Sequence, residues 1–389
     1  MNSGAPLKNV RVIDFSWVGA GSYLTRILAD LGADVVKVES TTRVDQIRVS
    51  PPFMGGERGV DRSGYFADRN SSKRSITVDL KQPRGLELVL GLIEDADVVA
   101  NNFAPGVMEK LGLGYSAVRE RRADVVYVTM SMQGSDGPHA ADVGYGLTIG
   151  ALSGLHGLVG EPGRPPIGTS TNFPDHVPSP GHAAFGVLCA LRHRAATGEG
   201  QLLELSQVEA TVAMLGPNML AASVGDRSGA QANEGPGPVH DVYPVAGDDR
   251  WIAISAQSPA DLQALTAVLG ADRSEALHPG GIAKHTRVLD GEALMAELQR
   301  AGVKAGLVQN ARDLIETDPQ LAHRGHWVRL PREGVGEFLY NVLPFRLSDH
   351  DVTPSRGFPA LGEHTAEVLA EAGFSQEEID DLTAAEVLR

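Results

Sequence analysis

The chain has 389 residues, a formal net charge of −15 and an isoelectric point near 5.2. This charge argues against nucleic acid or an anionic membrane as a partner, because both attract a dominant basic field. No apolar run approaches the ~20 residues of a membrane span, and the single cysteine, Cys189, allows neither an internal disulfide nor a cysteine-based metal cluster. We expect a cytoplasmic protein without a signal peptide or a metal site, and its length predicts two domains.

The N-terminal segment alternates strand and helix. Residues 10–15 are an apolar run typical of a buried strand, a glycine-bearing turn follows, and residues 23–31 have a helical pattern that Gly32 ends. Residues 33–39 return as a second strand, so the three elements form a β-α-β unit and predict a parallel sheet. The turn lacks a full G-x-G-x-x-G and indicates a dinucleotide site only weakly, although its helix N-terminus suits a phosphate or a carbonyl.

A polar stretch at residues 41–70 follows, and we expect it to cross a surface or a partner. The alternation of strands and helices then resumes at residues 75–80, 86–96, 97–100, 107–111, 116–122 and 125–131. This pattern predicts an α/β fold with a large, doubly wound, Rossmann-like parallel-sheet domain. Ligands of such sheets bind at the carboxyl ends of the strands.

A turn-rich stretch, residues 225–238, has no apolar pattern and marks a domain boundary. The strands and helices expected after it predict a smaller α+β domain at residues 225–323. The large domain is expected to span residues 1–224 and to be completed by residues 324–389. Just ahead of the boundary, residues 202–214 have the pattern of a long helix.

One carboxylate stands out in residues 172–207. Asp175 lies between prolines, in a stretch predicted to be a rigid loop, and residues 182–191 predict a buried helix that includes Cys189. A braced carboxylate suits chemistry, whereas a lone aspartate in such a loop is more often a turn or cap residue. His176 is adjacent, but neighbouring side chains diverge, which favours a turn role over a general base.

Five basic residues flank strand ends of the first domain: Lys73, Arg74, Lys81, Arg84 and Lys110. Single surface charges are usually only solvated. Because these five accompany loops where an α/β sheet binds ligands, in a strongly negative chain, they predict a local site for a phosphorylated ligand.

Blocks of sequence that follow one another along nearly the whole chain carry a family resemblance. They are LKNVRVIDFSWVGAGSYLTRILADLGADVVKVE, NSSKRSITVDLKQPRG, ADVVANNFAPGVMEKLGLG, PDHVPSPGHAAFGVLCALRHRAATGEGQ, DPQLAHRGHWV and FPALGEHTAEVLAEAG. Together they resemble the family III CoA-transferases, which include formyl-CoA:oxalate and carnitine CoA-transferases and α-methylacyl-CoA racemase. The resemblance implies an interlocked homodimer.

The resemblance implies that Asp175 is the catalytic nucleophile, which forms an acyl anhydride and then an aspartyl-CoA thioester. It also implies acyl-CoA and a carboxylic acid as substrates, with no tightly bound cofactor. Residues that fall where the family contacts CoA are Val18, Ala20, Val78, Asp79, Leu80, Lys81, Asn102, Phe103, Ala104 and Lys110. Arg43 is expected to replace a CoA-binding arginine of the family, because Ser40 stands in that place.

The expected acyl site departs from the family's pattern at several positions. Tyr145 matches a tyrosine near that site, whereas Gly19 and Gly146 stand where formyl-CoA transferase has Gln and Glu. These two glycines predict room for a bulkier acyl group. Gly235 and Gly237 are what remains of a flexible glycine run in that enzyme, and they also indicate a substrate other than oxalate.

These features predict a CoA-transferase that moves CoA from an acyl-CoA donor, for which succinyl-CoA is a commonplace choice, to a carboxylic acid. One alternative is an α-methylacyl-CoA racemase or epimerase. Racemisation needs an acid and a base on opposite faces of the α-carbon, and Tyr145 and Ser258 stand where the racemases have His and Glu. A second alternative is a CoA-binding subunit of a hetero-oligomeric CoA-transferase, which the presence of Asp175 disfavours.

Overall fold

The structure, a computed structural model, describes residues 4–389 except 161–162, 170, 226–236 and 279. The chain forms two compact units. Unit 1 comprises Met1–Gly157, Ile167–Arg227 and His323–Arg389, and unit 2 comprises Leu158–Pro166 and Ser228–Ala322. The predicted division into one domain of residues 1–224 and 324–389 and a second of residues 225–323 stays a prediction.

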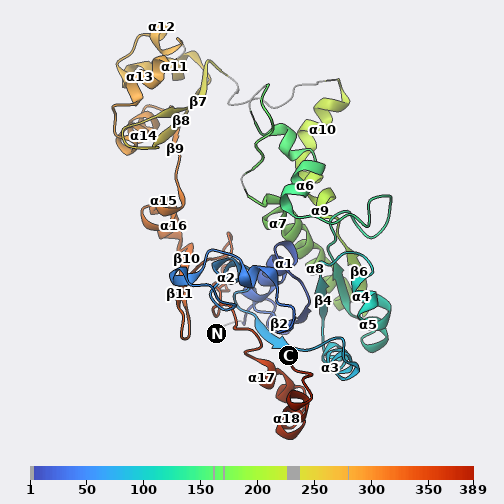
Figure 1. Cartoon of the computed structure of the whole chain (residues 1–389). Helices are drawn as coiled ribbons and strands as arrows, with labels where there is room; N and C mark the ends of the chain where they lie inside the picture. Colours follow the sequence, from blue (N-terminus) through green and yellow to red (C-terminus); the bar gives the residue numbers. More distant parts are fainter. Residues whose placement is uncertain (1–3, 161–162, 170, 226–236, 279) are drawn as a thin grey trace. The chain divides into compact units, whose positions relative to one another are not determined.

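Unit 1 is built on a six-stranded parallel sheet in the order β3-β2-β1-β4-β5-β6. Figure 1 labels β2, β4 and β6 of this sheet. The strands are β1 (Arg11–Asp14), β2 (Asp34–Glu39), β3 (Arg74–Thr77), β4 (Val98–Asn101), β5 (Val126–Thr129) and β6 (Gln201–Glu204). The direction of winding reverses between β1 and β4, which is the usual ligand position in doubly wound sheets. The predicted α/β, Rossmann-like fold is confirmed, and the interlocked dimer stays a prediction.

Helices connect these strands and complete unit 1. The α-helices are α1 (Ala20–Asp30), α2 (Gly64–Arg69), α3 (Pro83–Glu94), α4 (Val107–Lys110), α5 (Tyr115–Arg121), α6 (Gly146–Leu152), α7 (Phe173–His176), α8 (Pro178–Thr197), α9 (Gln207–Val212), α10 (Gly216–Ser223), α17 (Thr365–Glu371) and α18 (Gln376–Ala384). The 3-10 helices are η1 (Gln46–Val49), η2 (Met54–Gly56), η3 (Leu155–Leu158) and η4 (Ala213–Leu215). An antiparallel hairpin is formed by β10 (Trp327–Arg332) and β11 (Gly336–Asn341).

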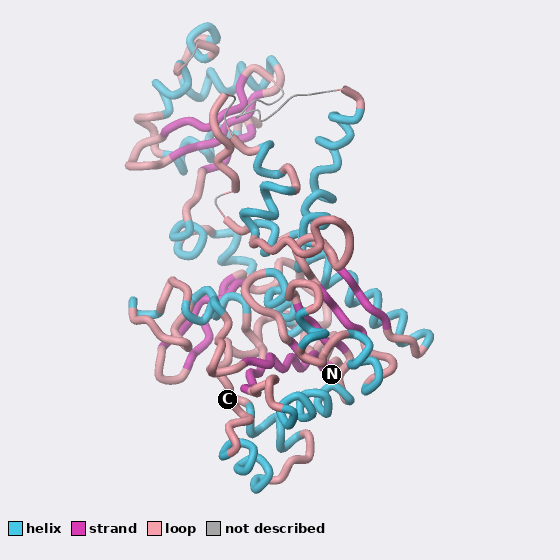
Figure 2. Tube along the Cα trace, turned by 45° about the vertical axis from the view of Figure 1, so that its right-hand side comes forward, coloured by secondary structure: helices cyan, strands magenta, loops and turns pink. Residues whose placement is uncertain are grey.

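Both faces of the large sheet are covered by helices (Figure 2). Ile13 and Val36 belong to a core that includes side chains of α3, α17 and α18. Their neighbours Val12 and Val35 belong to a second core with side chains of α1 and α8. Successive strand residues point to opposite faces, so burial on both sides explains why these strands are continuous apolar runs.

The predicted long helix at residues 202–214 is wrong. Gln201–Glu204 form the edge strand β6, which pairs in parallel with β5. Helix α9 begins only after Ser206, whose side chain accepts a hydrogen bond from the Glu209 N–H. Hydrogen bonding to a strand that is distant in sequence decides the conformation here, and local periodicity does not reveal it.

The proline-rich stretch around Asp175 is helical, so its prediction as a loop is wrong. Asp175 lies in the single-turn helix α7, and α8 begins at Pro178. Both helices carry proline in the first turn, where the missing N–H would have no partner inside the helix anyway. The prediction that the second helix is buried is wrong on one side, since Phe185 is 71% exposed and Cys189 is also exposed.

Residues 41–70 pack against their own unit. They contain η1, η2 and α2, and they bury Ile47 and Phe66 in a cluster with side chains of the β10–β11 hairpin and Phe358. The predicted polar excursion therefore holds a small core of its own, which its apolar residues are too sparse to reveal by periodicity.

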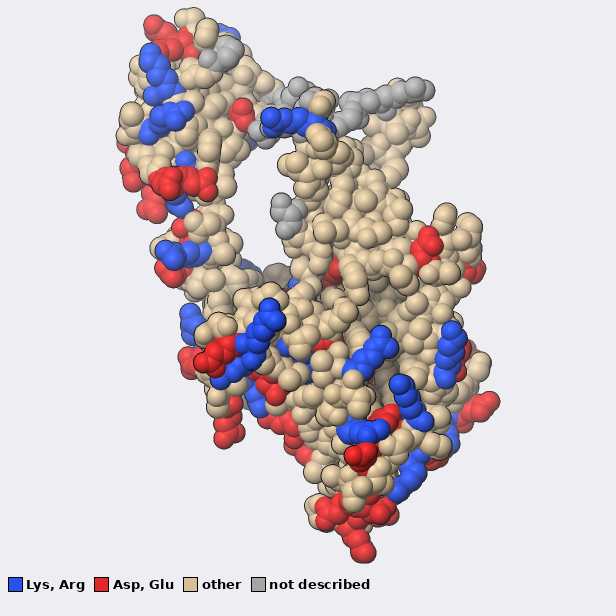
Figure 3. All heavy atoms as spheres, in the orientation of Figure 1, with Lys and Arg blue, Asp and Glu red and all other residues tan. Residues whose placement is uncertain are grey.

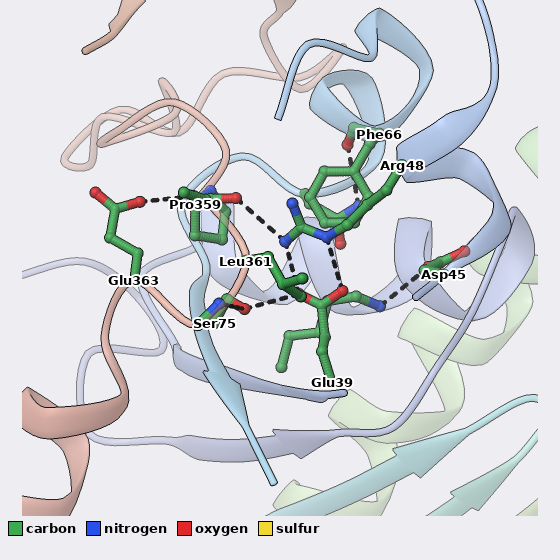
Figure 4. Close-up of polar contacts among 12 residues, drawn as sticks. Glu39, Asp45, Arg48, Phe66, Ser75, Pro359, Leu361 and Glu363 are labelled. Atoms are coloured by element: carbon green, nitrogen blue, oxygen red, sulfur yellow. Dashed lines mark hydrogen bonds and ion pairs between the residues drawn. The ribbon is translucent and has the colours of Figure 1, made fainter. Parts of the chain in front are cut away.

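A buried arginine ties this stretch to the sheet and to the C-terminal segment (Figure 4). Arg48 donates to the two carboxylate oxygens of Glu39 at 2.9 and 2.7 Å and to the Pro359 carbonyl at 3.2 Å. Its guanidinium carbon lies 3.7 Å from the centre of the Phe66 ring, and the Ser75 hydroxyl donates to Glu39 at 2.7 Å. A buried pair with this bidentate geometry and further hydrogen bonds compensates much of the cost of removing two charges from water.

Unit 2 has its own core. Its sheet and helices are β7 (Val239–Pro244), β8 (Trp251–Ala256), β9 (Lys304–Leu307), α11 (Pro259–Leu269), α12 (Arg273–Ala276), α13 (Gly281–Thr286), α14 (Gly291–Arg300) and α15 (Ala311–Glu316). The three strands are antiparallel, which confirms the small α+β part of the predicted fold. Helix α16 (Pro319–Arg324) continues the chain towards the hairpin of unit 1. Over the described ranges, no helix combines the length and the apolar character needed to cross a membrane.

We expect Arg48→Met to destabilise unit 1 by about 3–5 kcal/mol, because it leaves the Glu39 carboxylate buried without its partner. The matched control is Arg121→Met, which removes an exposed pair with Glu87 and Glu94 and should change the stability little. Chemical denaturation followed by circular dichroism measures both. Equal effects of the two substitutions would contradict the structural role assigned to Arg48.

Candidate active site

A cavity of about 560 Å³ lies at the point where the winding of the sheet reverses. The loops that follow β1 and β4 form one side of it, and α7 contributes Asp175. Its described lining residues are Trp17, Val18, Gly19, Ala20, Arg43, Gln46, Asn102, Phe103, Ala104, Ser131, Met132, Asp142, Val143, Gly144, Tyr145, Thr148, Asp175 and Gln207. Arg43 is the only lysine or arginine in that set.

Asp175 is buried, with 4% of its surface exposed. Its Oδ2 accepts a hydrogen bond of 3.0 Å from the Gly146 N–H, at the start of α6. Oδ1 accepts no hydrogen bond from any residue that the structure describes. One carboxylate oxygen is therefore held in place, while the other keeps its lone pairs for an electrophile.

Burial raises the pKa of Asp175 to about 6, and the Gly146 N–H and the charge of Arg69 oppose the shift. At pH 7 the carboxylate is then ionised in roughly nine of ten molecules. A higher pKa makes a carboxylate a better nucleophile, provided that it remains ionised at the working pH.

Two glycines allow the backbone to approach this carboxylate closely. A Cβ on Gly19 would lie 2.8 Å from the Cβ of Asp175, and a Cβ on Gly146 would lie 2.8 Å from its Oδ2 and 2.6 Å from the Cβ of Asn172. All three distances are shorter than the contacts that real Cβ atoms make. Any side chain at either position would displace Asp175, which is a local reason for the glycines that the sequence comparison with formyl-CoA transferase singled out.

Side chains hold the loop after β1 through hydrogen bonds to the backbone of Trp17 and Val18. Val18 has a left-handed backbone, with φ of +59°, and its N–H donates to Asp45 at 3.1 Å. Asn102 accepts from the Trp17 N–H and donates to the Trp17 carbonyl, both at 2.8 Å. A left-handed conformation is unfavourable for a β-branched residue, so these bonds are what hold Gly19 beside Asp175.

A buried network of charges lies beneath this loop. Lys37 Nζ is 3.3 Å from Asp45 Oδ2, Lys73 Nζ is 3.0 Å from Asp14 Oδ2, and Lys37 also donates to the carbonyl of Ser16. Burial, opposed by Asp14, lowers the pKa of Lys73 to about 8. All four charged side chains are essentially inaccessible.

The predicted basic cluster is therefore only partly available to a ligand. Lys73 is enclosed in the network, Arg74 is buried against Asp34 and two glutamates of α17, and Arg84 pairs with Asp381. The prediction that Lys73 and Arg74 bind a phosphorylated ligand is wrong, since both side chains are buried against carboxylates. For Arg84, whose side chain is 53% exposed, it stays a prediction.

A second cavity, of about 350 Å³, shares part of its wall with the first. The shared residues are Trp17, Arg43, Phe103 and Ala104. The predicted CoA contacts Val78, Asp79, Leu80 and Lys81 line only the second cavity. Arg43 and Lys81 are its two basic lining residues, and the Arg43 guanidinium lies 5.2 Å from the centre of the Trp17 ring.

The structure places the other predicted site residues as follows. Tyr145 lines the first cavity and its hydroxyl lies 3.3 Å from Gln46 Oε1. Lys110 is exposed and lines neither cavity. Gly237, in unit 2, has φ of +107° and a Cβ there would meet the Gln257 backbone at 2.5 Å. Gly235 lies outside the described residues.

Two residues considered for acid–base chemistry have other environments. Ser258 caps α11 in unit 2, where it accepts a hydrogen bond from the Asp261 N–H. Burial and the nearby Arg69 lower the pKa of His176 to about 4, so its imidazole is neutral at pH 7. His176 does not line the cavity.

Several residues of the site were not predicted. Asp45 and Gln46 come from the stretch that was expected to be a surface excursion, and Ser131 and Gln207 follow β5 and β6. Ser131 could have been found from its position after a predicted strand. Gln207 could not, because the strand before it was mistaken for helix.

We expect Asp175→Asn to stabilise the protein at high pH. The folded pKa of about 6 exceeds the ordinary value of 3.8, so the unfolded chain loses this proton first as pH rises. Above pH 6 the ionised, buried carboxylate costs the fold about 3 kcal/mol, a cost that is absent below pH 4. The stability difference between variant and wild type should therefore grow by about that amount from pH 4 to pH 8 in denaturation titrations; a pH-independent difference would contradict the raised pKa.

Comparisons with known proteins identify the family of the chain. Residues 7–365 match the model of the family described as CoA-transferase family III. The succinyl-CoA:mesaconate CoA-transferase of Haloarcula hispanica is 32% identical over 388 residues, which cover 94% of this chain and 96% of that protein. The human succinyl-CoA:glutarate CoA-transferase is 26% identical over 408 residues, covering 100% and 91%.

A solved structure has the same fold. The crystal structure of a CAIB/BAIF family protein from Brucella suis superimposes with a TM-score of 0.86 at 29% identity, and the match covers 95% of this chain and all of that one. The family match spans most of the chain and includes every described residue that lines the two cavities. The chain belongs to CoA-transferase family III and is an enzyme of that family.

Proposed function

We propose that this enzyme transfers CoA from succinyl-CoA to a carboxylic acid through covalent intermediates on Asp175. The observation that carries the proposal is the buried Asp175 carboxylate, with one oxygen held by Gly146 and the other free in a cavity. Succinyl-CoA is chosen as donor because the names of several relatives, from Haloarcula hispanica to human, contain it.

The first half of the reaction consumes the donor. Asp175 Oδ1 attacks the thioester carbonyl of succinyl-CoA, the C–S bond breaks, and CoA leaves as a thiolate, so that a succinyl-aspartyl anhydride forms. The thiolate then attacks the carbonyl carbon of Asp175 and releases succinate. The product is an aspartyl-CoA thioester, and no net proton is consumed.

The second half runs the same steps in reverse order with the acceptor. Its carboxylate attacks the aspartyl thioester and releases CoA thiolate, which attacks the acceptor's carbonyl carbon in the new anhydride and regenerates Asp175. In two steps a nucleophile attacks the carbonyl carbon of Asp175: CoA thiolate attacks the anhydride, and the acceptor carboxylate attacks the thioester. Negative charge then develops on the carbonyl oxygen of Asp175. The Gly146 N–H, 3.0 Å from Oδ2, is placed to stabilise it, as oxyanion-hole donors do.

Burial also protects the intermediates. An anhydride hydrolyses in water, and exclusion of water from a closed site suppresses this side reaction. Asp175 is only 4% exposed. Gly19 and Gly146 lie close against it, and it lines the first cavity.

The two cavities supply a path for CoA. We propose that the adenosine end occupies the second cavity, beside residues 78–81, and that the pantetheine arm passes Phe103 and Ala104 to reach Asp175. Arg43 and Lys81 are then the cations available to the phosphates. Lys110, which lies outside both cavities, is a less direct candidate for this role.

The alternatives have less support. A racemase needs two groups that exchange protons on opposite faces of the α-carbon, and the positions expected for them hold Tyr145, bonded to Gln46, and Ser258, which caps a helix. A subunit that only binds CoA would not need Asp175 with a raised pKa. The cytoplasmic location stays a prediction.

We also propose a homodimer, because a large apolar surface of unit 1 has no partner in the described chain. Helix α10 has no buried residue, and Leu147, Phe185 and Leu220 are 59%, 71% and 66% exposed. Few charged side chains appear around α6 and α10 in Figure 3. Exposed apolar surface of this extent marks protein interfaces.

Light scattering on the purified protein tests the dimer. We expect a mass of about twice the 41.1 kDa of one chain. A monomer at micromolar concentration would contradict the proposal.

Asp175→Ala should abolish CoA transfer between succinyl-CoA and a carboxylic acid. In the wild type, succinyl-CoA followed by borohydride or hydroxylamine should modify Asp175, which peptide mass spectrometry would locate. Asp142→Ala is the matched control, because Asp142 is an exposed aspartate of the same cavity and should still allow the modification.

Two outcomes would contradict the proposal: full transfer activity in Asp175→Ala, or no modification of the wild type by any acyl-CoA. Deuterium wash-in at the α-carbon without an acceptor acid would instead identify a racemase. Activity that appears only after addition of a second, homologous chain would identify a subunit.

A further inference from the structure

Two buried polar groups in the cavity wall have no hydrogen-bond partner in the part of the chain that the structure describes. Ser131 and Gln207 are 3% and 6% exposed and line the first cavity together with Asp175. The Ser131 hydroxyl and Gln207 Oε1 make no hydrogen bond to each other or to any other residue that the structure describes. Each unpaired buried polar group lowers the stability of the fold by about 1–3 kcal/mol. Two such groups in one cavity wall therefore indicate that a ligand binds there and supplies their hydrogen bonds.

The fold holds both groups in position. Ser131 follows β5, and Gln207 opens α9 after the neighbouring strand β6. The Gln207 N–H donates to the Ser131 carbonyl at 3.1 Å, which ties the two residues together. The Gln207 side chain donates from Nε2 to the Met130 carbonyl at 3.0 Å, and this bond leaves Oε1 as the unpaired atom.

The chemistry of the two atoms defines the ligand group. Gln207 Oε1 only accepts a hydrogen bond, whereas the Ser131 hydroxyl can donate one. A hydroxyl group has both functions, because it can donate a hydrogen bond to Gln207 Oε1 and accept one from the Ser131 hydroxyl. A carboxylate has no proton for Oε1, and a methylene leaves both atoms unpaired.

The position of the pair points to the acyl side of the site. Neither residue lines the second cavity, which we assign to the adenosine end of CoA, and both share the first cavity with Asp175. That the pair contacts the acyl group therefore rests on the proposed function. We propose that Ser131 and Gln207 bind a hydroxyl group on the carbon chain of the acyl substrate, so that the enzyme prefers hydroxy acids.

Binding of matched pairs of CoA thioesters tests this subsite. The pairs are butyryl-CoA with 2-hydroxybutyryl-CoA, butyryl-CoA with 3-hydroxybutyryl-CoA, and succinyl-CoA with malyl-CoA. Calorimetry in an Asp175→Asn background, which prevents turnover, should show at least one hydroxylated ligand bound about 5- to 100-fold more tightly, as expected for one buried polar group that gains its partner. Ser131→Ala should remove most of that preference and leave the affinity for the unhydroxylated partner unchanged.

Ser179→Ala is the matched control. Ser179 is also fully buried with an unpaired hydroxyl, but it does not line the cavity, so its loss should leave the preference intact. Ser131→Ala removes an atom that makes no hydrogen bond in the described chain, and the variant is expected to fold normally. The midpoint of thermal unfolding verifies this for both variants.

The outcomes separate this proposal from the proposed function. No preference for any hydroxylated ligand would overturn the subsite even if CoA transfer through Asp175 is established. Equal weakening of both members of a pair by Ser131→Ala would assign the residue to the pantetheine arm and also overturn it. A hydroxyl preference that Ser131→Ala abolishes, in an enzyme without transferase activity, would support the subsite and reject the transfer mechanism.

Discussion

Asp45, buried beneath the loop that follows β1, accepts the hydrogen bond that holds Val18 in a left-handed backbone. Lys37, from the interior of the sheet, lies 3.3 Å from this carboxylate and also donates to the Ser16 carbonyl. A β-branched residue adopts this conformation only when its surroundings compensate the strain, which is of order 1–3 kcal/mol. The charge pair therefore decides where Gly19 lies, and Gly19 forms the wall next to Asp175. The charges buried in the sheet act on the site through the backbone and not by touching a substrate.

The burial that suits Asp175 to the proposed nucleophilic role also makes its ionised form costly for the fold. Desolvation raises its pKa to about 6, which increases its nucleophilicity while it remains largely ionised at neutral pH. Gly146 supplies one hydrogen bond and Gly19 supplies close contact without a side chain. Active sites commonly contain groups that lower the stability of the fold. Here Arg48 and its bidentate bond to Glu39, at the end of β2, help to hold the surrounding segments together.

The fold was largely predictable up to β5, because its strands are continuous apolar runs separated by glycine-bounded helices. The predictions were wrong where hydrogen bonds or ion pairs to residues far away in the sequence decide the structure. Strand β6 exists because it bonds to β5, and no pattern within residues 202–214 reveals that. Lys73 was predicted to bind a ligand because its charge is visible in the sequence, but its partner Asp14 is 59 residues away and encloses it. A basic residue near a strand end can thus form an ion pair inside the core and need not bind a ligand.

The sequence by itself determined the class of fold and the family, because apolar periodicity and the order of the motifs can be read along the chain. It also singled out Asp175 as the residue for which we propose a nucleophilic role. Only the tertiary structure decided that Asp175 is buried beside Gly146, and that Asp45 holds the loop at Val18. It also decided that Ser131 and Gln207 share a cavity wall, where the Ser131 hydroxyl and Gln207 Oε1 have no hydrogen-bond partner among the described residues. Burial, pKa and the pairing of polar groups depend on which segments meet in space, and that information is absent from the order of residues along any one segment.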